Sequence, residues 1–175
     1  MGLIGKLNSK NFTLFIISFF GIGLISRKMP GTVGSAFATF LSIFLVKNPN
    51  TLLLLLIAFF IAGVILCDYF VVKMEFAQNK DPGYIVIDEV CGILLGTYFL
   101  QIFGYASAFS LITNFAIFRF FDILKPPPIK NIENAMKNNQ KTIALGIMLD
   151  DILASLFATV SQILILKIIN LLYNP

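Results

Sequence analysis

The sequence predicts an all-α fold: a polytopic integral membrane bundle of about four or five helical spans, with its functional site at the cytoplasmic membrane face. Of the 175 residues, 58% are hydrophobic and only 13% are charged. A soluble domain carries about 25% charged residues, so this chain has roughly half the polar sequence that a soluble domain needs. The apolar residues also gather into runs of helical length. Little polar sequence remains for a second, soluble domain. Residues 1–175 are therefore expected to form a single domain.

The first apolar run covers residues 12–26 and is interrupted by Gly21 and Gly23. A span needs about 20 apolar residues, so this run either crosses with help from its neighbours, re-enters the membrane or lies at the interface. Two further runs, residues 36–46 and 51–72, are separated by a short stretch containing Pro and Asn. We expect these two runs to form a helical hairpin.

The second half of the chain repeats this pattern with apolar runs at residues 90–103 and 106–118. Three prolines at 126–128 must end the helix before them, because proline lacks an amide donor and disfavours α geometry in the preceding residue. Residues 129–141 are polar and rich in Asn and Lys, which predicts a connection. Residues 142–173 are apolar with few interruptions and predict a final helix.

Positive charge is distributed unevenly between the expected loops. If consecutive runs cross and return, stretches 27–35, 73–87 and 119–141 share one side with nine Lys and Arg residues, while the other side keeps Lys47 and Lys167. Cytoplasmic loops carry an excess of positive charge, so the shared side is expected to face the cytoplasm. The excess also favours contact with anionic lipid head groups. No pattern indicates a nucleic-acid partner, and none specifies an oligomeric state.

Acidic residues interrupt the apolar runs at three places: Asp88 with Glu89, Asp122, and Asp150 with Asp151. A charge at membrane depth costs on the order of 2.5–3.5 kcal/mol, so such residues are expected to serve a function. In the topology above, all three places lie near cytoplasmic helix ends. They are therefore predicted to form one metal-dependent phosphate site. Carboxylate oxygens suit Mg²⁺, which also keeps waters and binds substrate phosphate.

Neighbouring residues on a helix point about 100° apart, so each acidic pair is expected to offer one metal ligand and one supporting group. The alternative is that one acid of each pair only forms an ion pair with a nearby cation. Arg119, Asp122 and Lys125 share one helical stripe. This row is either a plain internal salt bridge or a metal ligand flanked by two phosphate-binding cations.

The sequence PGTVGS at residues 30–35 opens a helix. Its glycines allow the backbone to approach a ligand, Thr32 and Ser35 offer hydroxyl groups, and a helix N-terminus favours anions. Arg27 and Lys28 lie just upstream and favour binding of substrate phosphate. Both the hydroxyl residues and the two cations have an alternative explanation. Thr or Ser before a helix often only caps it, and Arg27 and Lys28 also serve as topology anchors at the cytoplasmic side.

The chain contains no histidine, which excludes phosphohistidine chemistry and the lipid phosphatases that need paired histidines. Neither Cys67 nor Cys91 begins a C-x5-R loop, and no D-x-D motif is present for an aspartyl-phosphate route. A phosphate-ester hydrolase built from these residues must therefore use metal-activated water with a carboxylate as the base.

Four blocks occur in a specific order and spacing within about residues 26–158: PGTVGS at 30–35, DPGYIVIDEVCG at 81–92, FRFFDILKPPPI at 118–129 and GIMLDDILA at 146–154. Together they resemble the phosphatidylglycerophosphatase A family of bacterial membrane lipid phosphatases. The chain departs from the family pattern at Ser155, where glycine is common, and in the lead into the last block.

The resemblance implies Mg²⁺-dependent hydrolysis of the terminal phosphate monoester of phosphatidylglycerophosphate, giving phosphatidylglycerol in phospholipid biosynthesis. It implies a multi-pass protein of the bacterial cytoplasmic (inner) membrane, with its active site facing the cytoplasm. We expect Asp88, Asp122 and Asp151 to hold Mg²⁺, with Glu89 and Asp150 as further ligands or as the base. The expected phosphate-binding groups are Arg27, Lys28, Thr32, Ser35, Arg119 and Lys125.

Two other functions use similar residues. A small cation- or proton-coupled membrane transporter also contains buried carboxylates, but it predicts acids at the midplane or on both sides of the membrane. Transfer of a phosphoalcohol between lipids also uses Mg²⁺ and carboxylates. The D-G-x-x-A-R signature of that chemistry is absent from the chain.

Overall fold

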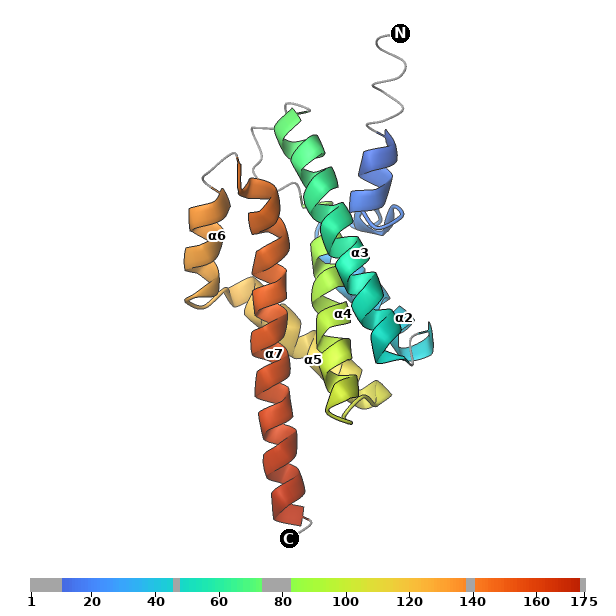
Figure 1. Ribbon diagram of the computed structural model, residues 1–175, viewed down its shortest axis with the longest axis vertical. Helices are drawn as coiled ribbons and strands as arrows, with labels where there is room; N and C mark the ends of the chain where they lie inside the picture. The colour runs from blue at the N-terminus through green and yellow to red at the C-terminus, as the bar shows by residue number, and fades with distance from the viewer. Residues whose placement is uncertain (1–10, 46–47, 74–82, 138–140, 174–175) are drawn as a thin grey trace.

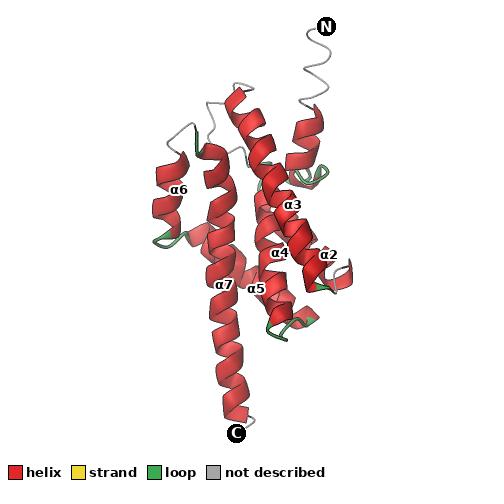
Figure 2. Ribbon diagram, viewed as in Figure 1, coloured by secondary structure: helices red, strands yellow, loops and turns green. Residues whose placement is uncertain are grey.

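The computed structural model describes residues 11–45, 48–73, 83–137 and 141–173. These residues form helices and no strands, which confirms the all-α class (Figure 2). After a short helical segment at residues 11–17, the elements run in the following order: η1 Ile22–Leu24, α2 Pro30–Leu45, α3 Pro49–Cys67, η2 Asp68–Lys73, α4 Ile87–Ile102, α5 Ala108–Leu124, α6 Ile129–Lys137 and α7 Ile143–Tyr173.

Helix α4 is the centre of the bundle and contacts α2, α3, α5 and α7 (Figure 1). Two of its glycines permit close packing. A β-carbon at Gly92 would lie 2.8 Å from the Phe118 ring of α5 and 3.2 Å from the Asp151 carbonyl oxygen of α7. A β-carbon at Gly96 would overlap the side chain of Asn114. Small residues at these positions let the helices approach one another closely, as is typical of helices packed in membranes.

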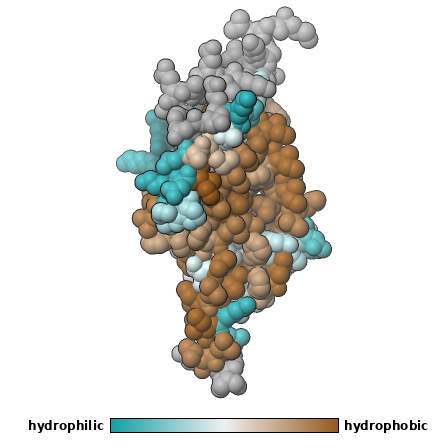
Figure 3. Space-filling view, turned by 60° about the vertical axis from the view of Figure 1, so that its left-hand side comes forward, coloured by the Kyte–Doolittle hydropathy of each residue, from teal (hydrophilic) through white to brown (hydrophobic). Residues whose placement is uncertain are grey.

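Within the described ranges, two helices are long and apolar enough to cross a membrane, Pro49–Val71 and Ile143–Leu172. Only 22% of the most apolar window in the first and 33% in the second is buried within the protein. Figure 3 shows apolar side chains over most of one face, with hydrophilic residues gathered in separate patches. Exposed apolar surface of this kind marks an interaction site for a membrane or a protein, and it agrees with the membrane bundle expected from the sequence.

The first apolar run does not form one continuous helix. Its helix ends at Ile17, and Phe19, Phe20 and Gly21 then adopt left-handed backbone angles, with φ of 48°, 58° and 88°. The amide of Val86 donates to the carbonyl of Ile17 across 3.0 Å, so the run is tied to the segment that leads into α4.

Residues 129–141 differ from the predicted connection, because most of them form α6. Ile129 is fully buried, Ile132 and Met136 are half-buried, and together they recur at helical spacing along one face. This short stripe is enough to dock α6 on α7, although the segment is polar overall. The predicted stop at the prolines is confirmed, since α5 ends at Leu124 and Lys125 adopts a left-handed conformation.

Candidate active site

Three helices supply the acidic residues of the site. Asp88 and Glu89 lie in the first turn of α4, where a helix N-terminus stabilises negative charge. Asp122 lies near the end of α5, and Asp151 lies about two turns into α7. Because α4, α5 and α7 pack against one another, these helix ends are neighbours, and the acids that are far apart in sequence come together.

Asp88, Glu89 and Asp151 form the centre of this carboxylate cluster. Each offers one oxygen, and these three oxygens lie within 4.8 Å of one another. Asp88 and Asp151 are buried and Glu89 is half-buried. Asp122 is close enough to interact electrostatically with both Glu89 and Asp151. Four mutually repelling carboxylates in a largely buried site require a counter-charge.

Arg119 of α5 supplies part of this counter-charge. Its Nη1 atom lies 2.6 Å from Asp122 Oδ2 and 3.7 Å from Glu89 Oε1. One guanidinium cannot neutralise four carboxylates. Its Nε and Nη1 atoms are buried and, within the part of the chain that the structure describes, make no well-aligned hydrogen bond. Arg119 therefore has donors available for a further anion next to the cluster.

Glu89 carries an unused acceptor. Its Oε2 atom is buried and has no hydrogen-bond partner among the described residues. Leaving a charged group's atom buried without a partner is costly, and such an atom marks a place where an ion or water belongs. An unpartnered oxygen in a compact set of carboxylates fits a hard divalent cation, so the cluster could bind a metal ion.

Gly31 in the first turn of α2 closes one side of the cluster. A β-carbon at this position would overlap Glu89 Oε1 and lie 3.1 Å from Arg119 Nη1. The absence of a side chain at Gly31 therefore leaves the space that Glu89 and Arg119 occupy. The close approach also brings the N-terminus of α2 to the site, where its amide groups favour anions.

Asp150 faces a different set of partners. Its Oδ2 atom accepts a 2.7 Å hydrogen bond from Lys125 Nζ, which also donates to Glu133 Oε1 across 2.8 Å. This second ion-pair group joins the end of α5 to α6 and α7. Within the pair, the structure thus places Asp151 in the carboxylate cluster and Asp150 beside it.

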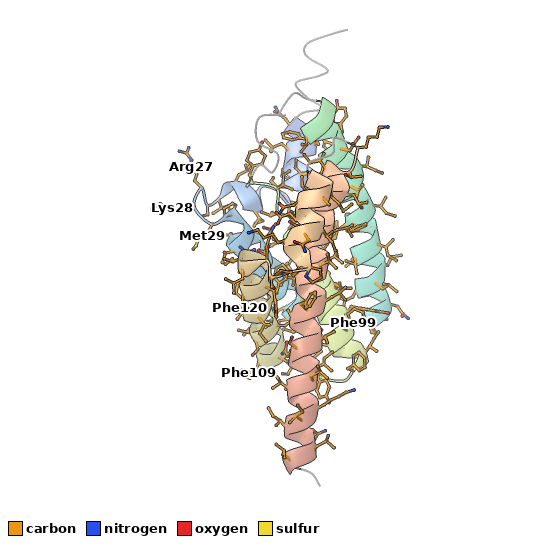
Figure 4. All side chains as sticks on the ribbon, turned by 90° about the vertical axis from the view of Figure 1, so that its left-hand side faces the viewer. Arg27, Lys28, Met29, Phe99, Phe109 and Phe120 are labelled. Atoms are coloured by element: carbon orange, nitrogen blue, oxygen red, sulfur yellow. The ribbon has the colours of Figure 1, made fainter. Side chains whose placement is uncertain are left out.

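The remaining residues expected to bind phosphate lie at varying distances from the cluster. Ser35 is fully buried and donates its hydroxyl hydrogen to the Gly31 carbonyl within α2. Thr32 is half-buried and follows Gly31 in the first turn. Arg27 and Lys28 are exposed in the loop before α2, on the outer edge of the bundle (Figure 4).

Two contacts in and beside the site were not predicted from the sequence: the ion pair of Glu133 with Lys125 and the packing of Gly31 against Glu89. Glu133 pairs with Lys125 from a helix that was expected to be a connection, and no local spacing relates the two residues. Gly31 was expected to let the backbone approach a ligand, whereas its packing against Glu89 depends on how α2 meets α4. The glycine in the sequence indicated a close approach at this position, but it did not indicate that Glu89 is the residue it packs against.

Comparison with known proteins gives the family. The family model described as "Phosphatidylglycerophosphatase A" matches residues 15–166, which is most of the chain. The chain belongs to the phosphatidylglycerophosphatase A family. The chain is accordingly a phosphatase, and the resemblance found in the four blocks is confirmed.

Two similar proteins support this placement within the phosphatidylglycerophosphatase A family. A "Phosphatidylglycerophosphatase A" from Haemophilus influenzae is 35% identical over 143 residues, covering 81% of this chain and 80% of its own length. A Bacteroides thetaiotaomicron protein named "Putative phosphatidylinositol-3-phosphatase" is 31% identical over 149 residues, covering 79% of this chain and 84% of its own length. No solved structure is significantly similar to the chain.

Proposed function

We propose that this protein is a Mg²⁺-dependent phosphatase that hydrolyses the terminal phosphate monoester of phosphatidylglycerophosphate, releasing phosphatidylglycerol and phosphate for phospholipid biosynthesis. The observation that carries the proposal is the unpartnered Oε2 atom of Glu89, buried in a set of carboxylates beside the guanidinium of Arg119. Carboxylates suit a divalent cation and the guanidinium suits a phosphate. The site therefore offers ligands for the metal ion and, next to them, donors for the substrate phosphate.

The metal would be held by oxygens of Asp88, Glu89 and Asp151, with Asp122 as a further ligand. Oxygen-only ligands favour Mg²⁺ over softer metals. When bound, the ion would neutralise negative charge on the phosphate oxygens and lower the pKa of a coordinated water. A carboxylate oxygen that does not contact the metal would accept the proton of the attacking water.

Arg119 would bind the phosphate through the donors that remain after its contact with Asp122. The amide groups at the start of α2 and the hydroxyl group of Thr32 would add further donors on the same side, with the buried Ser35 one turn behind them. Lys125 would add positive charge nearby and keep Asp150 in place as a supporting group. Together these groups would stabilise the negative charge that is redistributed over the phosphoryl and leaving-group oxygens in the transition state.

The surface and the charge distribution of the protein support a placement in the membrane. We propose a multi-pass protein of the bacterial inner membrane in which α3 and α7 cross with other helices, making about four or five spans. The site would face the cytoplasm, consistent with the positive-inside rule. The whole chain would act as one phosphatase domain.

The names of both relatives mention lipids of one chemical type. Phosphatidylglycerophosphate and phosphatidylinositol 3-phosphate each carry a phosphate monoester on a polyol that is joined to diacylglycerol through a phosphodiester. We propose that the chain acts on this type of head group, with glycerol as the polyol, since the chain matches a family model of that name over most of its length.

Phosphate release by the purified protein tests the proposal. Wild type should hydrolyse phosphatidylglycerophosphate in detergent micelles with Mg²⁺ and lose this activity with EDTA. Asp88→Asn and Asp122→Asn should lower kcat by about 10²- to 10⁴-fold. Asp68→Asn, the same chemical change at the start of η2, is the matched control. Metal-independent release, or wild-type rates in both cluster variants, would refute the proposal.

A further inference from the structure

We propose that Arg27, Lys28 and Tyr84 form a second anion subsite, which binds the phosphodiester of the lipid substrate while the carboxylate cluster binds its terminal phosphate. This inference rests on the proposed function, because it assumes a head group with two phosphates. It assigns to Arg27 and Lys28 the recognition of the phosphate that is not cleaved.

The subsite is a hollow of about 610 Å³ between the loop before α2 and the segment before α4. Its walls come from both segments and contain positively charged residues, residues with hydroxyl groups and glycines. They include Gly23, Ser26, Arg27, Lys28, Gly83 and Tyr84. The hollow is open to the surface, as a lipid head group requires, and its polar groups suit an anion.

Arg27 and Lys28 are available to bind a ligand. Both are exposed, and no acidic side chain among the described residues forms an ion pair with either. Figure 4 shows them on the outer edge of the bundle beside Met29. The neighbouring Leu24 and Ile25 are 51% and 71% exposed, which suits contact with the acyl region of a bilayer. Cations next to inserted apolar residues lie at the depth of the lipid phosphates.

Tyr84 adds a neutral donor to the two cations. Its ring packs edge-on against Phe70, with the ring centroids 6.3 Å apart, which holds the side chain in the wall of the hollow. Burial raises the pKa of the Tyr84 phenol, so its hydroxyl remains protonated at neutral pH. The described residues offer this hydroxyl no hydrogen-bond partner, so it can donate to a phosphate oxygen.

Two segments of the chain join the hollow to the carboxylate cluster. Pro30, in its wall, precedes Gly31, which packs against Glu89. On the other side, Tyr84 is three residues before the first turn of α4. A β-carbon at Gly23 would overlap the carbonyl oxygen of Tyr84, so the two walls are in direct contact there. The subsite and the cluster are thus adjacent, as two phosphates joined by a glycerol unit require.

This arrangement predicts selectivity between lipid monoesters. Phosphatidylglycerophosphate fills both places, whereas phosphatidic acid has a monoester but no phosphodiester and fills only the cluster. Contacts to the phosphodiester, which does not change during the reaction, contribute equally to binding of the substrate and of the transition state. Their loss should therefore raise KM and leave kcat nearly unchanged.

The experiment compares both substrates, with identical acyl chains, in nonionic detergent micelles, where attraction to an anionic surface is small. Arg27→Gln with Lys28→Gln should raise KM for phosphatidylglycerophosphate about tenfold, keep kcat within about twofold and change KM for phosphatidic acid less than twofold. Tyr84→Phe should raise KM for phosphatidylglycerophosphate about threefold. Lys130→Gln removes the same charge from the exposed surface of α6 and is the matched control.

Binding of phosphatidylglycerol, which carries only the phosphodiester, provides a measurement without turnover. The double variant should bind it about tenfold more weakly than wild type, and Asp88→Asn should bind it normally. Equal loss on both monoesters, unchanged KM, or unchanged phosphatidylglycerol binding in the double variant would overturn the subsite. A wild-type protein that binds phosphatidylglycerol through these residues but releases no phosphate from either lipid would instead overturn the proposed function.

Discussion

Gly31 and Glu89 touch: the first turn of α2 passes so close to the first turn of α4 that a β-carbon at position 31 would occupy the place of Glu89 Oε1. The two helix N-termini therefore meet at one carboxylate. A helix N-terminus favours anions, so two of them at one place favour a phosphate there. The position of Glu89 depends on the absence of a side chain at residue 31.

Gly31→Ala should consequently impair the site. The added methyl group must displace Glu89 or separate α2 from α4, and a misplacement of about 1 Å commonly costs about 100-fold in rate. We expect kcat/KM for lipid phosphate release to fall by about that factor. Ala36→Leu, at an exposed position in the same helix, is the control for a larger side chain and should retain wild-type activity. An active Gly31→Ala enzyme would contradict this packing.

Replacement of Asp151 should mainly lower activity, whereas replacement of the adjacent Asp150 should mainly lower stability. Asp151→Asn should lower kcat by about 10²- to 10⁴-fold with little change in thermal stability, because it removes a charge from a repulsive cluster. Asp150→Asn should lower the free energy of unfolding by about 1–3 kcal/mol, because it leaves Lys125 with a weaker partner. Activity assays and thermal unfolding in detergent measure the two effects.

Glu133→Gln is the matched variant for the effect on stability. It weakens the other ion pair of Lys125 from α6, outside the carboxylate cluster. If the Lys125 group is structural, Glu133→Gln and Asp150→Asn should lower the unfolding temperature similarly and retain most activity. Loss of activity in Asp150→Asn comparable to that in Asp151→Asn would place both acids in the catalytic machinery.

Divalent metal should stabilise the folded protein. A cation that binds only the native state at a concentration of 100 Kd adds about 2.7 kcal/mol to the free energy of unfolding. We therefore expect Mg²⁺ to raise the unfolding temperature of the wild type and EDTA to reverse the increase. Glu89→Gln should abolish this shift, and Asp68→Asn should retain it. The same Mg²⁺-induced shift in Glu89→Gln would exclude Glu89 as a ligand.

A polar network between α5 and α7 should contribute to stability but not to catalysis. The Asn114 amide donates to Thr159 Oγ1 across 3.2 Å and to Gln162 Oε1 across 2.9 Å, and Gln162 donates to Ser110. Asn114→Leu leaves two buried acceptors without this donor and should destabilise the fold by about 0.6–2 kcal/mol.

Thr113→Val is the control for the polar network. Among the described residues, the exposed Thr113 hydroxyl donates to the Phe109 carbonyl of its own helix and to no residue of α7. Thermal unfolding should distinguish the two variants, whereas kcat per folded molecule should remain at the wild-type value in both. A substantial loss of kcat in Asn114→Leu, with the protein folded, would show that the network also affects the site.

Much of the fold could be predicted from local sequence. Long apolar runs, short Pro- and Asn-containing turns and the proline stop after Lys125 indicated where helices begin and end, because these signals act on the backbone directly. Helix α6 was missed because its apolar face consists of only a few residues. That face stabilises the helix only because it packs on α7, and the local sequence does not show which segment will cover it.

By itself, the sequence determined that the protein is an apolar all-helical chain and which acids, cations and glycines are available to it. The spacing of neighbouring acids left open which of them face inward, since a helix can rotate about its own axis. Tertiary packing decided this. Gly92 lets α4 approach Phe118 and the backbone of α7 at Asp151, and the resulting helix rotations bring Asp151 to Glu89 and direct Asp150 to Lys125.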